Sequence, residues 1–191
     1  SMLTADAQYA ANLATMTTQP ALLPLIEQMS QLPLTNLHLA PGPTGALVGA
    51  AWDLPTQTWM PLCDMAQPVE AAAQAAAQMW SPQQTVFTMI GLGLGYAIQA
   101  FAAKLLPYQR LVVWEPEATF FKAMLSALDI NTVFGGKRVE IFVGADVLAR
   151  MEPWYLSLEV HEKLHLAFPV SHAYTGQYRK ADYDAVMAQC M

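Results

Sequence analysis

The chain has 191 residues and a net charge of −6, and charged residues make up only 13% of it against 54% hydrophobic residues. This length suits one good-sized domain with its own core, and the scattered basic residues form no stripe that could neutralise phosphates, so we exclude nucleic acid as a partner. Charged residues make up about 25% of a typical soluble domain. We therefore expect either an alanine-rich sequence or a surface that another domain or subunit covers.

Residues 1–84 predict a helical segment followed by a small β-meander. Residues 4–30 carry apolar side chains at helical spacing, interrupted by Pro20 and Pro24. The segments NLHLAPG, GALVGAAWD and TQTWMPLC are typical of short strands between Pro and Gly turns. The run PVEAAAQAAAQMW, residues 68–80, predicts a helix because alanine costs least in a helix and the proline suits its first turn.

Strands alternate with helices in the second part of the chain, residues 85–191. The expected strands are TVFTMIG, RLVVWE, RVEIFVG and KLHLAFPV. The expected helices are Leu94–Leu106, Pro116–Leu128, a short helix ending near Met151 and a closing helix from about Gln177. Such alternation predicts parallel strands joined by right-handed crossovers. We therefore predict a Rossmann-like, doubly wound α/β fold with a mostly parallel sheet.

The central motif is GLGLGY, in which Gly91, Gly93 and Gly95 follow a buried strand and precede a helix. In such a unit the first glycine permits a tight turn, the second lets a ligand approach closely, and the helix presents unpaired N–H groups to an anion. The spacing resembles the S-adenosylmethionine loop of class I methyltransferases more than the dehydrogenase fingerprint. The alternative is a turn that only lets the helix pack closely on the sheet. The sequence leaves both interpretations open.

Two acidic residues and one tyrosine complete the candidate site. Glu115 ends the second strand 24 residues after the first glycine, where such folds place a carboxylate that binds ribose hydroxyls. Asp146 follows the third strand, near where an acidic residue often faces the adenine. Tyr96 either stacks on a base or belongs to the core. Met89, where methyltransferases commonly carry an acidic residue, and Pro116 both argue against a methyltransferase.

The sequence HEKLH at residues 161–165 matches the zinc-protease pattern. That site requires a helix through both histidines, whereas KLHLAFPV alternates like a strand and Pro169 bars a long helix. In a strand, His161 and His165 would lie about 13 Å apart. We therefore predict no metal site at this motif.

The cysteines and the apolar segments indicate a cytoplasmic protein without a membrane span. Cys63 and Cys190 stand alone, without metal or redox spacing, which fits a reducing compartment. Residues 86–103 carry no charge, but three glycines and Gln99 interrupt them, and 18 residues is marginal for a bilayer.

The motifs quoted above resemble one known family. The segments MIGLGLGYAIQAF, LVVWEPEATFFKAML and RVEIFVGAD closely resemble the N-terminal domain of the bacterial Maf proteins, the motility accessory factors. Residues 91–96 and the pair Glu115 and Pro116 match that family's glycine loop and its strand ending in Glu-Pro. The upstream helix and meander and the aromatic stretch SHAYTGQYRKADYDAV also fit, so the resemblance covers nearly the whole chain.

The resemblance implies one part of a flagellin glycosyltransferase. Maf proteins are regarded as enzymes that attach nonulosonic acids, such as pseudaminic or legionaminic acid, to Ser/Thr hydroxyls of flagellin, with a CMP-sugar as donor. Their transferase centre lies in a central domain with a glycine-proline-serine motif that does not occur here. We therefore expect a non-catalytic fragment of a longer protein, with no catalytic residue of its own.

Such a domain would pack on the missing central domain and bind flagellin, a nucleotide or a nucleotide sugar. Tyr174, Tyr178 and Tyr183 would either meet the central domain or form one face of a half-buried helix. The alternative is an S-adenosylmethionine-dependent, methyltransferase-like enzyme that uses the three glycines, Glu115 and Asp146.

Overall fold

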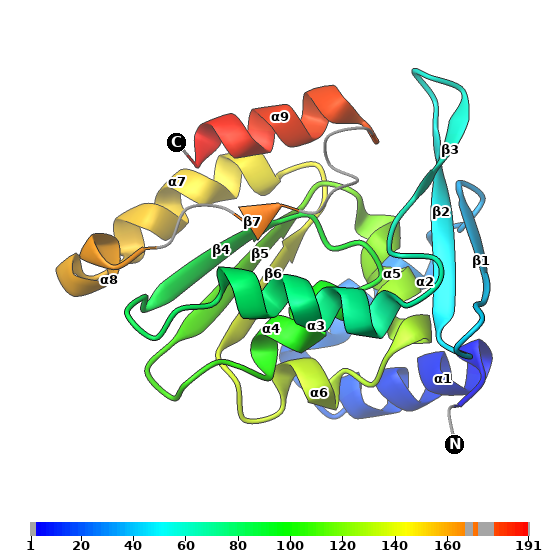
Figure 1. The fold of residues 1–191 in the computed structure, drawn as a ribbon, viewed down its shortest axis with the longest axis horizontal. Helices are drawn as coiled ribbons and strands as arrows, with labels where there is room; N and C mark the ends of the chain where they lie inside the picture. Colours follow the sequence, from blue (N-terminus) through cyan, green and yellow to red (C-terminus); the bar gives the residue numbers. More distant parts are fainter. Residues whose placement is uncertain (1–2, 167–169, 172–177, 191) are drawn as a thin grey trace.

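The computed structural model describes residues 3–166, 170–171 and 178–190. It contains a three-stranded antiparallel sheet and a four-stranded parallel sheet with helices packed around them (Figure 1). In chain order the elements are α1 (Ala5–Met16), the 3-10 helix η1 (Pro20–Leu22), α2 (Leu23–Ser30), β1 (Leu37–Pro41), β2 (Leu47–Asp53), β3 (Thr58–Pro61), α3 (Pro68–Met79), β4 (Val86–Ile90), α4 (Tyr96–Ala102), β5 (Arg110–Glu115), α5 (Ala118–Ala127), α6 (Asn131–Phe134), β6 (Val139–Val143), α7 (Val147–Ser157), α8 (Val160–Leu164), β7 (Val170–Ser171) and α9 (Lys180–Gln189).

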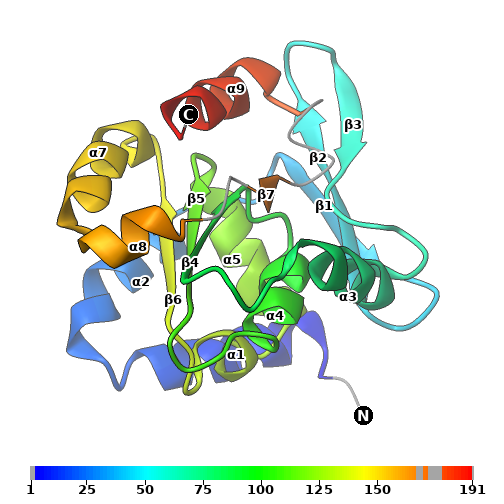
Figure 2. The same ribbon diagram turned by 60° about the vertical axis from the view of Figure 1, so that its left-hand side comes forward.

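The parallel sheet confirms the predicted fold class. Its strands lie in the order β6-β5-β4-β7, so the chain moves outward from β4 to β6 and then returns to the other side of β4. In Figure 2, α7 and α8 lie on one side of this sheet, and α3, α4 and α5 lie on the other. Helices on both faces bury both sides of the strands, which is why β4 and β5 are nearly continuous apolar runs.

The antiparallel sheet is the predicted meander, with β2 between β1 and β3. It packs against the start of α4, where the hydroxyl of Tyr96 donates a hydrogen bond of 2.6 Å to the carbonyl of Leu47. A side chain at Gly49 would collide with Leu39 of the neighbouring strand and approach Leu94, so the meander lies close to the glycine loop there. The N-terminal helices and the meander therefore share one hydrophobic core with the parallel sheet.

A buried amide helps to hold the helix α1 against this core. Asn12 is 1% exposed, and its Nδ2 donates to the carbonyls of Leu125 and Leu128, each at 2.7 Å. Its Oδ1 accepts a hydrogen bond of 3.1 Å from the N–H of Ile130. The amide therefore satisfies backbone groups at the end of α5 that would otherwise be buried without partners.

The expected strand KLHLAFPV is wrong at its start, because the chain is helical through Leu164. Helix α8 begins with a capping box in which Glu159 and Glu162 each bond the other's backbone N–H. The Nε of Arg110 also lies 3.2 Å from a carboxylate oxygen of Glu162. The segment joins the sheet later, by an isolated bridge between Leu166 and Val86 and by the two-residue strand β7.

Several helix ends also differ from the prediction. Helix α4 is shorter than expected, since Gly95 precedes its first turn in a left-handed conformation and residues beyond Ala102 form tighter turns. Helix α7 runs beyond Met151 to Ser157 with Pro153 inside it. Over the described residues, no helix combines the length and the apolar character that crossing a membrane requires.

Candidate functional site

The glycine loop adopts backbone conformations that favour glycine. Gly91, Gly93 and Gly95 have φ values of 94°, 55° and 88°, a region that side chains rarely adopt. Every residue from Gly91 to Tyr96 is buried. A Cβ at Gly95 would lie 2.4 Å from Cγ of Met124, so this glycine lets α4 approach α5. The third glycine therefore has a packing role.

Glu115 lies directly beside this loop, at the end of β5. Its side chain is fully buried, and its Oε1 accepts a hydrogen bond of 2.7 Å from the N–H of Leu92. Its Oε2 accepts one of 3.0 Å from the N–H of Glu117 and another from the hydroxyl of Tyr183. A buried carboxylate needs such donors because removal from water is costly. In the described state these donors all come from the protein itself.

Tyr183 belongs to α9 and is 68 residues from Glu115 in the sequence. Both Tyr183 and Tyr178 are 1% exposed, and their rings lie 6.3 Å apart. They are therefore buried within this chain, which disfavours the alternative in which they contact another domain. The third tyrosine of that group, Tyr174, lies outside the described residues. The i,i+3 spacing of Tyr183 and Val186 predicts that Tyr183 faces inward, but only the packing of α9 identifies Glu115 as the partner of Tyr183.

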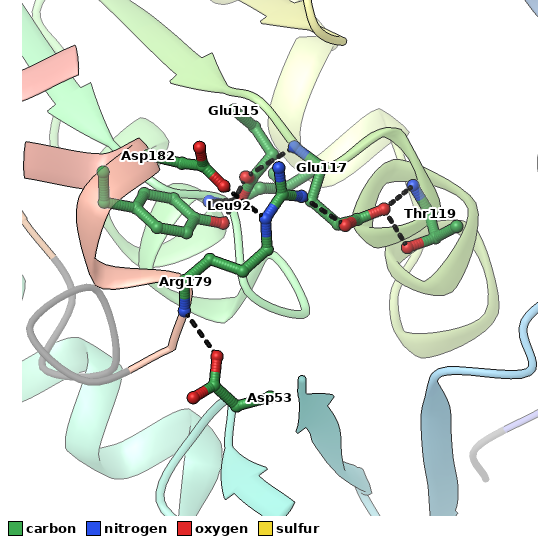
Figure 3. Close-up of polar contacts among 8 residues, drawn as sticks. Asp53, Leu92, Glu115, Glu117, Thr119, Arg179 and Asp182 are labelled. Atoms are coloured by element: carbon green, nitrogen blue, oxygen red, sulfur yellow. Dashed lines mark hydrogen bonds and ion pairs between the residues drawn. The ribbon is translucent and has the colours of Figure 1, made fainter. Parts of the chain in front are cut away.

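Arg179 ties the start of α9 to two other parts of the fold (Figure 3). Its guanidinium lies 2.5 Å from Glu117 and 2.7 Å from Asp182, and its backbone N–H donates to Asp53 at 2.9 Å. Burial lowers the pKa of Arg179, but the hydrogen bond to Asp182 and the charges of Glu117 and Asp182 outweigh that effect and raise it. Arg179 has φ 42°, so the chain makes a left-handed turn where these contacts converge.

Asp53 and Glu117 are themselves positioned by hydroxyl groups. Asp53 is 1% exposed and accepts a hydrogen bond of 2.5 Å from the hydroxyl of Thr56. This hydrogen bond, with smaller contributions from the backbone N–H groups of Arg179 and Thr56, lowers the pKa of Asp53 against the opposing effect of burial. Glu117 accepts a hydrogen bond of 2.8 Å from the hydroxyl of Thr119 in the first turn of α5 (Figure 3).

The structure separates the other two predicted site residues from this cluster. The hydroxyl of Tyr96 donates to Leu47, and burial raises the pKa of Tyr96 to about 12. Tyr96 thus belongs to the core between the two sheets. The side chain of Asp146 is 66% exposed and lies 4.0 Å from Arg150 on the next turn of α7. The sequence therefore placed the glycines and Glu115 together correctly, while the ligand-binding role of all six residues stays a prediction.

Three members of the site were not predicted from the sequence: Tyr183, Arg179 and Asp53. Asp53 ends a strand of the meander, and the other two residues lie at or in the closing helix. The residue types of Tyr183 and Arg179 offered a clue, because a buried carboxylate requires hydroxyl, N–H or guanidinium donors. No spacing rule connects segments this far apart along the chain.

The HEKLH segment is not the strand that the sequence predicts. Val160–Leu164 is a helix, and His165 follows directly after it. His161 lies 3.3 Å from Glu159 and is exposed to solvent. Within the part of the chain that the structure describes, no three His, Cys, Asp or Glu residues are grouped so as to hold a metal ion.

Comparison with known proteins adds little to this geometry. No protein-family model matches the sequence, and no curated protein matches it at a significant level. Among solved structures, the chain is similar to MnmC2 from Aquifex aeolicus, with 12% sequence identity and a TM-score of 0.36. The match covers 65% of this chain and spans 46% of that one, less than half of its length. Similarity this distant carries no argument about function.

Proposed function

We propose that the chain is a non-catalytic accessory domain of a Maf-type protein glycosyltransferase, which attaches a nonulosonic acid to Ser/Thr of flagellin. The sequence support is the match of the glycine loop and of the Glu-Pro pair at Glu115 to that family. The domain would pack on a central transferase domain elsewhere in the same protein. It would contribute binding of flagellin or of a nucleotide rather than the transfer chemistry.

One observation carries the non-catalytic part of this proposal. Glu115 is the group that a methyltransferase-like enzyme would direct to its cofactor, and here it accepts hydrogen bonds from Leu92, Glu117 and Tyr183. The glycine loop beside it is buried. Both features favour a loop that serves as a turn and a packing surface while α9 is in place.

Ligand-dependent thermal unfolding of the wild-type chain tests the choice between the two functions. A ligand at a hundred times its dissociation constant adds about 2.7 kcal/mol, which raises the melting temperature by roughly 5 to 10 °C for a chain of this size. We expect no such shift with S-adenosylhomocysteine. A shift that Gly93→Asp abolishes and Gly136→Asp preserves would overturn the proposal in favour of a methyltransferase. Both glycines have positive φ, but Gly136 has open space around it.

A genetic experiment tests the link to flagellin. Deletion of the gene in the organism that encodes it should remove the nonulosonic acid from flagellin, which lowers the intact mass by one residue for each modified site. Complementation with the full gene should restore that mass. An unchanged flagellin mass after deletion would contradict the assignment to flagellin glycosylation.

A further inference from the structure

We propose that α9 is a displaceable lid on a ribonucleoside site, in which the hydroxyl of Tyr183 occupies the position on Glu115 that a ribose hydroxyl would take. This inference does not rest on the proposed function, because a gated nucleoside site is compatible with an accessory domain and with an enzyme.

The position of Glu115 in the sheet supports a binding site. It lies at the carboxyl end of β5, next to the loop that follows β4. The strand order reverses beside β4, since β5 and β7 lie on its two sides. In open α/β sheets, ligands bind in the crevice at the carboxyl ends of the strands at such a reversal. The helix α9 contacts β4 and places Tyr183 on Glu115 at this edge.

The hydrogen bonds of Glu115 explain why a hydroxyl group is the expected ligand group. The backbone N–H groups of Leu92 and Glu117 each hold one oxygen of the carboxylate, so its orientation does not depend on α9. A further hydrogen bond to this carboxylate comes from the hydroxyl of Tyr183, on α9. Displacing α9 leaves an oriented, charged acceptor that favours hydroxyl donors. The vicinal hydroxyls of a ribose supply that chemistry.

The attachment of α9 is suited to displacement. Of its ten residues, all of them described, only Tyr183 and Val186 are buried, whereas α5 buries six residues in the same length. Polar contacts also hold it in place, through Tyr183 to Glu115 and through Arg179 to Glu117 and Asp53. Elements with few buried apolar contacts open at lower free energy than the core of a domain.

A closed lid lowers the apparent affinity of the site in proportion to the fraction of molecules that are open. Loss of a hydrogen bond to a charged group destabilises the closed state by about one decade in equilibrium constant or more. Tyr183→Phe removes that bond and keeps the ring, while the bound nucleoside restores a donor to Glu115. We therefore expect tighter binding in the variant, by about tenfold.

The experiment measures adenosine and cytidine binding to the full chain by isothermal titration calorimetry. Tyr183→Phe should bind at least one of them about tenfold more tightly than the wild type, and Arg179→Ala about threefold more tightly. Tyr108→Phe is the matched control, because it loses a hydroxyl bonded to the carbonyl of Pro82 at the opposite edge of the sheet. It should bind as the wild type does. The 2′,3′-dideoxy forms should lose the gain.

The outcomes separate the lid from the proposed function. If Tyr183→Phe and Arg179→Ala fold, as judged by near-UV circular dichroism, and bind no more tightly than Tyr108→Phe, the lid is refuted. If Tyr183→Phe does not fold, Arg179→Ala alone decides, because it leaves the Glu115 contacts intact. Equal gains for the dideoxy forms would refute ribose recognition. The ratio of variant to wild-type affinity tests the lid, whereas S-adenosylhomocysteine with the wild type tests the proposed function.

Discussion

The two edges of the parallel sheet are each closed by a buried polar side chain, but the chemistry differs. At the amino edge Gln109 is 1% exposed, and its Nε2 donates to the carbonyls of Ser81 and Gln84 at 2.8 and 2.9 Å. Its Oε1 accepts from Nε1 of Trp80 and from the N–H of Leu106, at 2.9 and 3.0 Å. A neutral amide thus joins the segments that lead into β4 and β5.

At the carboxyl edge the closing group is a charged carboxylate, Glu115, and one of its donors comes from α9, far along the chain. Displacing α9 would therefore remove one hydrogen bond from this carboxylate. The partners of Gln109 do not depend on α9, since they all lie on segments that flank β4 and β5. Closure of the amino edge therefore depends on segments beside β4 and β5, whereas closure of the carboxyl edge also depends on the distant helix α9. Variants at the two edges should therefore differ in their effects on stability and on nucleoside binding.

Replacing Glu115 should cost the most stability. Glu115→Leu leaves the N–H groups of Leu92 and Glu117 and the hydroxyl of Tyr183 without this acceptor. Each orphaned buried group costs about 1–3 kcal/mol, so we expect the free energy of unfolding in urea to fall by about 4 kcal/mol. Glu115→Gln keeps one acceptor oxygen and should lose less. A loss below about 1 kcal/mol for Glu115→Leu would show that this edge does not depend on the carboxylate.

The glycines at the two edges should respond unequally to alanine. Gly95→Ala combines φ +88° with a Cβ only 2.4 Å from Cγ of Met124, whereas Gly136→Ala at the amino edge has φ +68° and open space. The left-handed conformation costs about 1–2 kcal/mol for either alanine, and overpacking adds about 1–3 kcal/mol at Gly95. Denaturant melts should therefore show about 3 kcal/mol against about 1 kcal/mol. Equal losses would mean that α5 adjusts and that Gly95 has no packing role.

Replacing Gln109 should affect stability alone. Gln109→Leu removes the partners of two carbonyls and two N–H groups, which should lower the free energy of unfolding by about 2 kcal/mol, because part of this network reaches solvent. Nucleoside affinity should remain that of the wild type. A change in nucleoside affinity would show that the amino edge also affects binding, which would contradict the expected difference between the two edges.

The weakest expected effect is a pH dependence at Asp53. The hydrogen bond from Thr56, with contributions from backbone N–H groups, holds the pKa of Asp53 below its ordinary value of 3.8. Because the folded-state pKa is lowered, this stabilisation is present above pH 3.8 and is lost as the pH falls through the folded value. Urea unfolding at pH 5 and pH 3 should therefore show a larger acid loss for the wild type than for Asp53→Asn. Equal losses would indicate that folding does not lower the pKa of Asp53.

The fold followed largely from local patterns. Apolar runs such as RLVVWE and the Gly and Pro punctuation predicted the meander and the first three parallel strands, because both signals depend on neighbours within a few residues. The prediction of a strand from residue 163 was wrong at its start, where apparent alternation concealed the end of α8. The capping box of Glu159 and Glu162 is also a local signal, and it would have favoured a helix there.

Local patterns also predicted only part of the candidate site. Local rules placed glycines at the turn after β4 and an acidic residue at the end of β5, since positive φ and strand ends are properties of short segments. No local rule distinguishes Glu115, buried under Tyr183, from Asp146, which is exposed beside Arg150. That distinction depends on where α9 packs, and packing is set by contacts between side chains that are distant in the sequence and adjacent only in the folded chain.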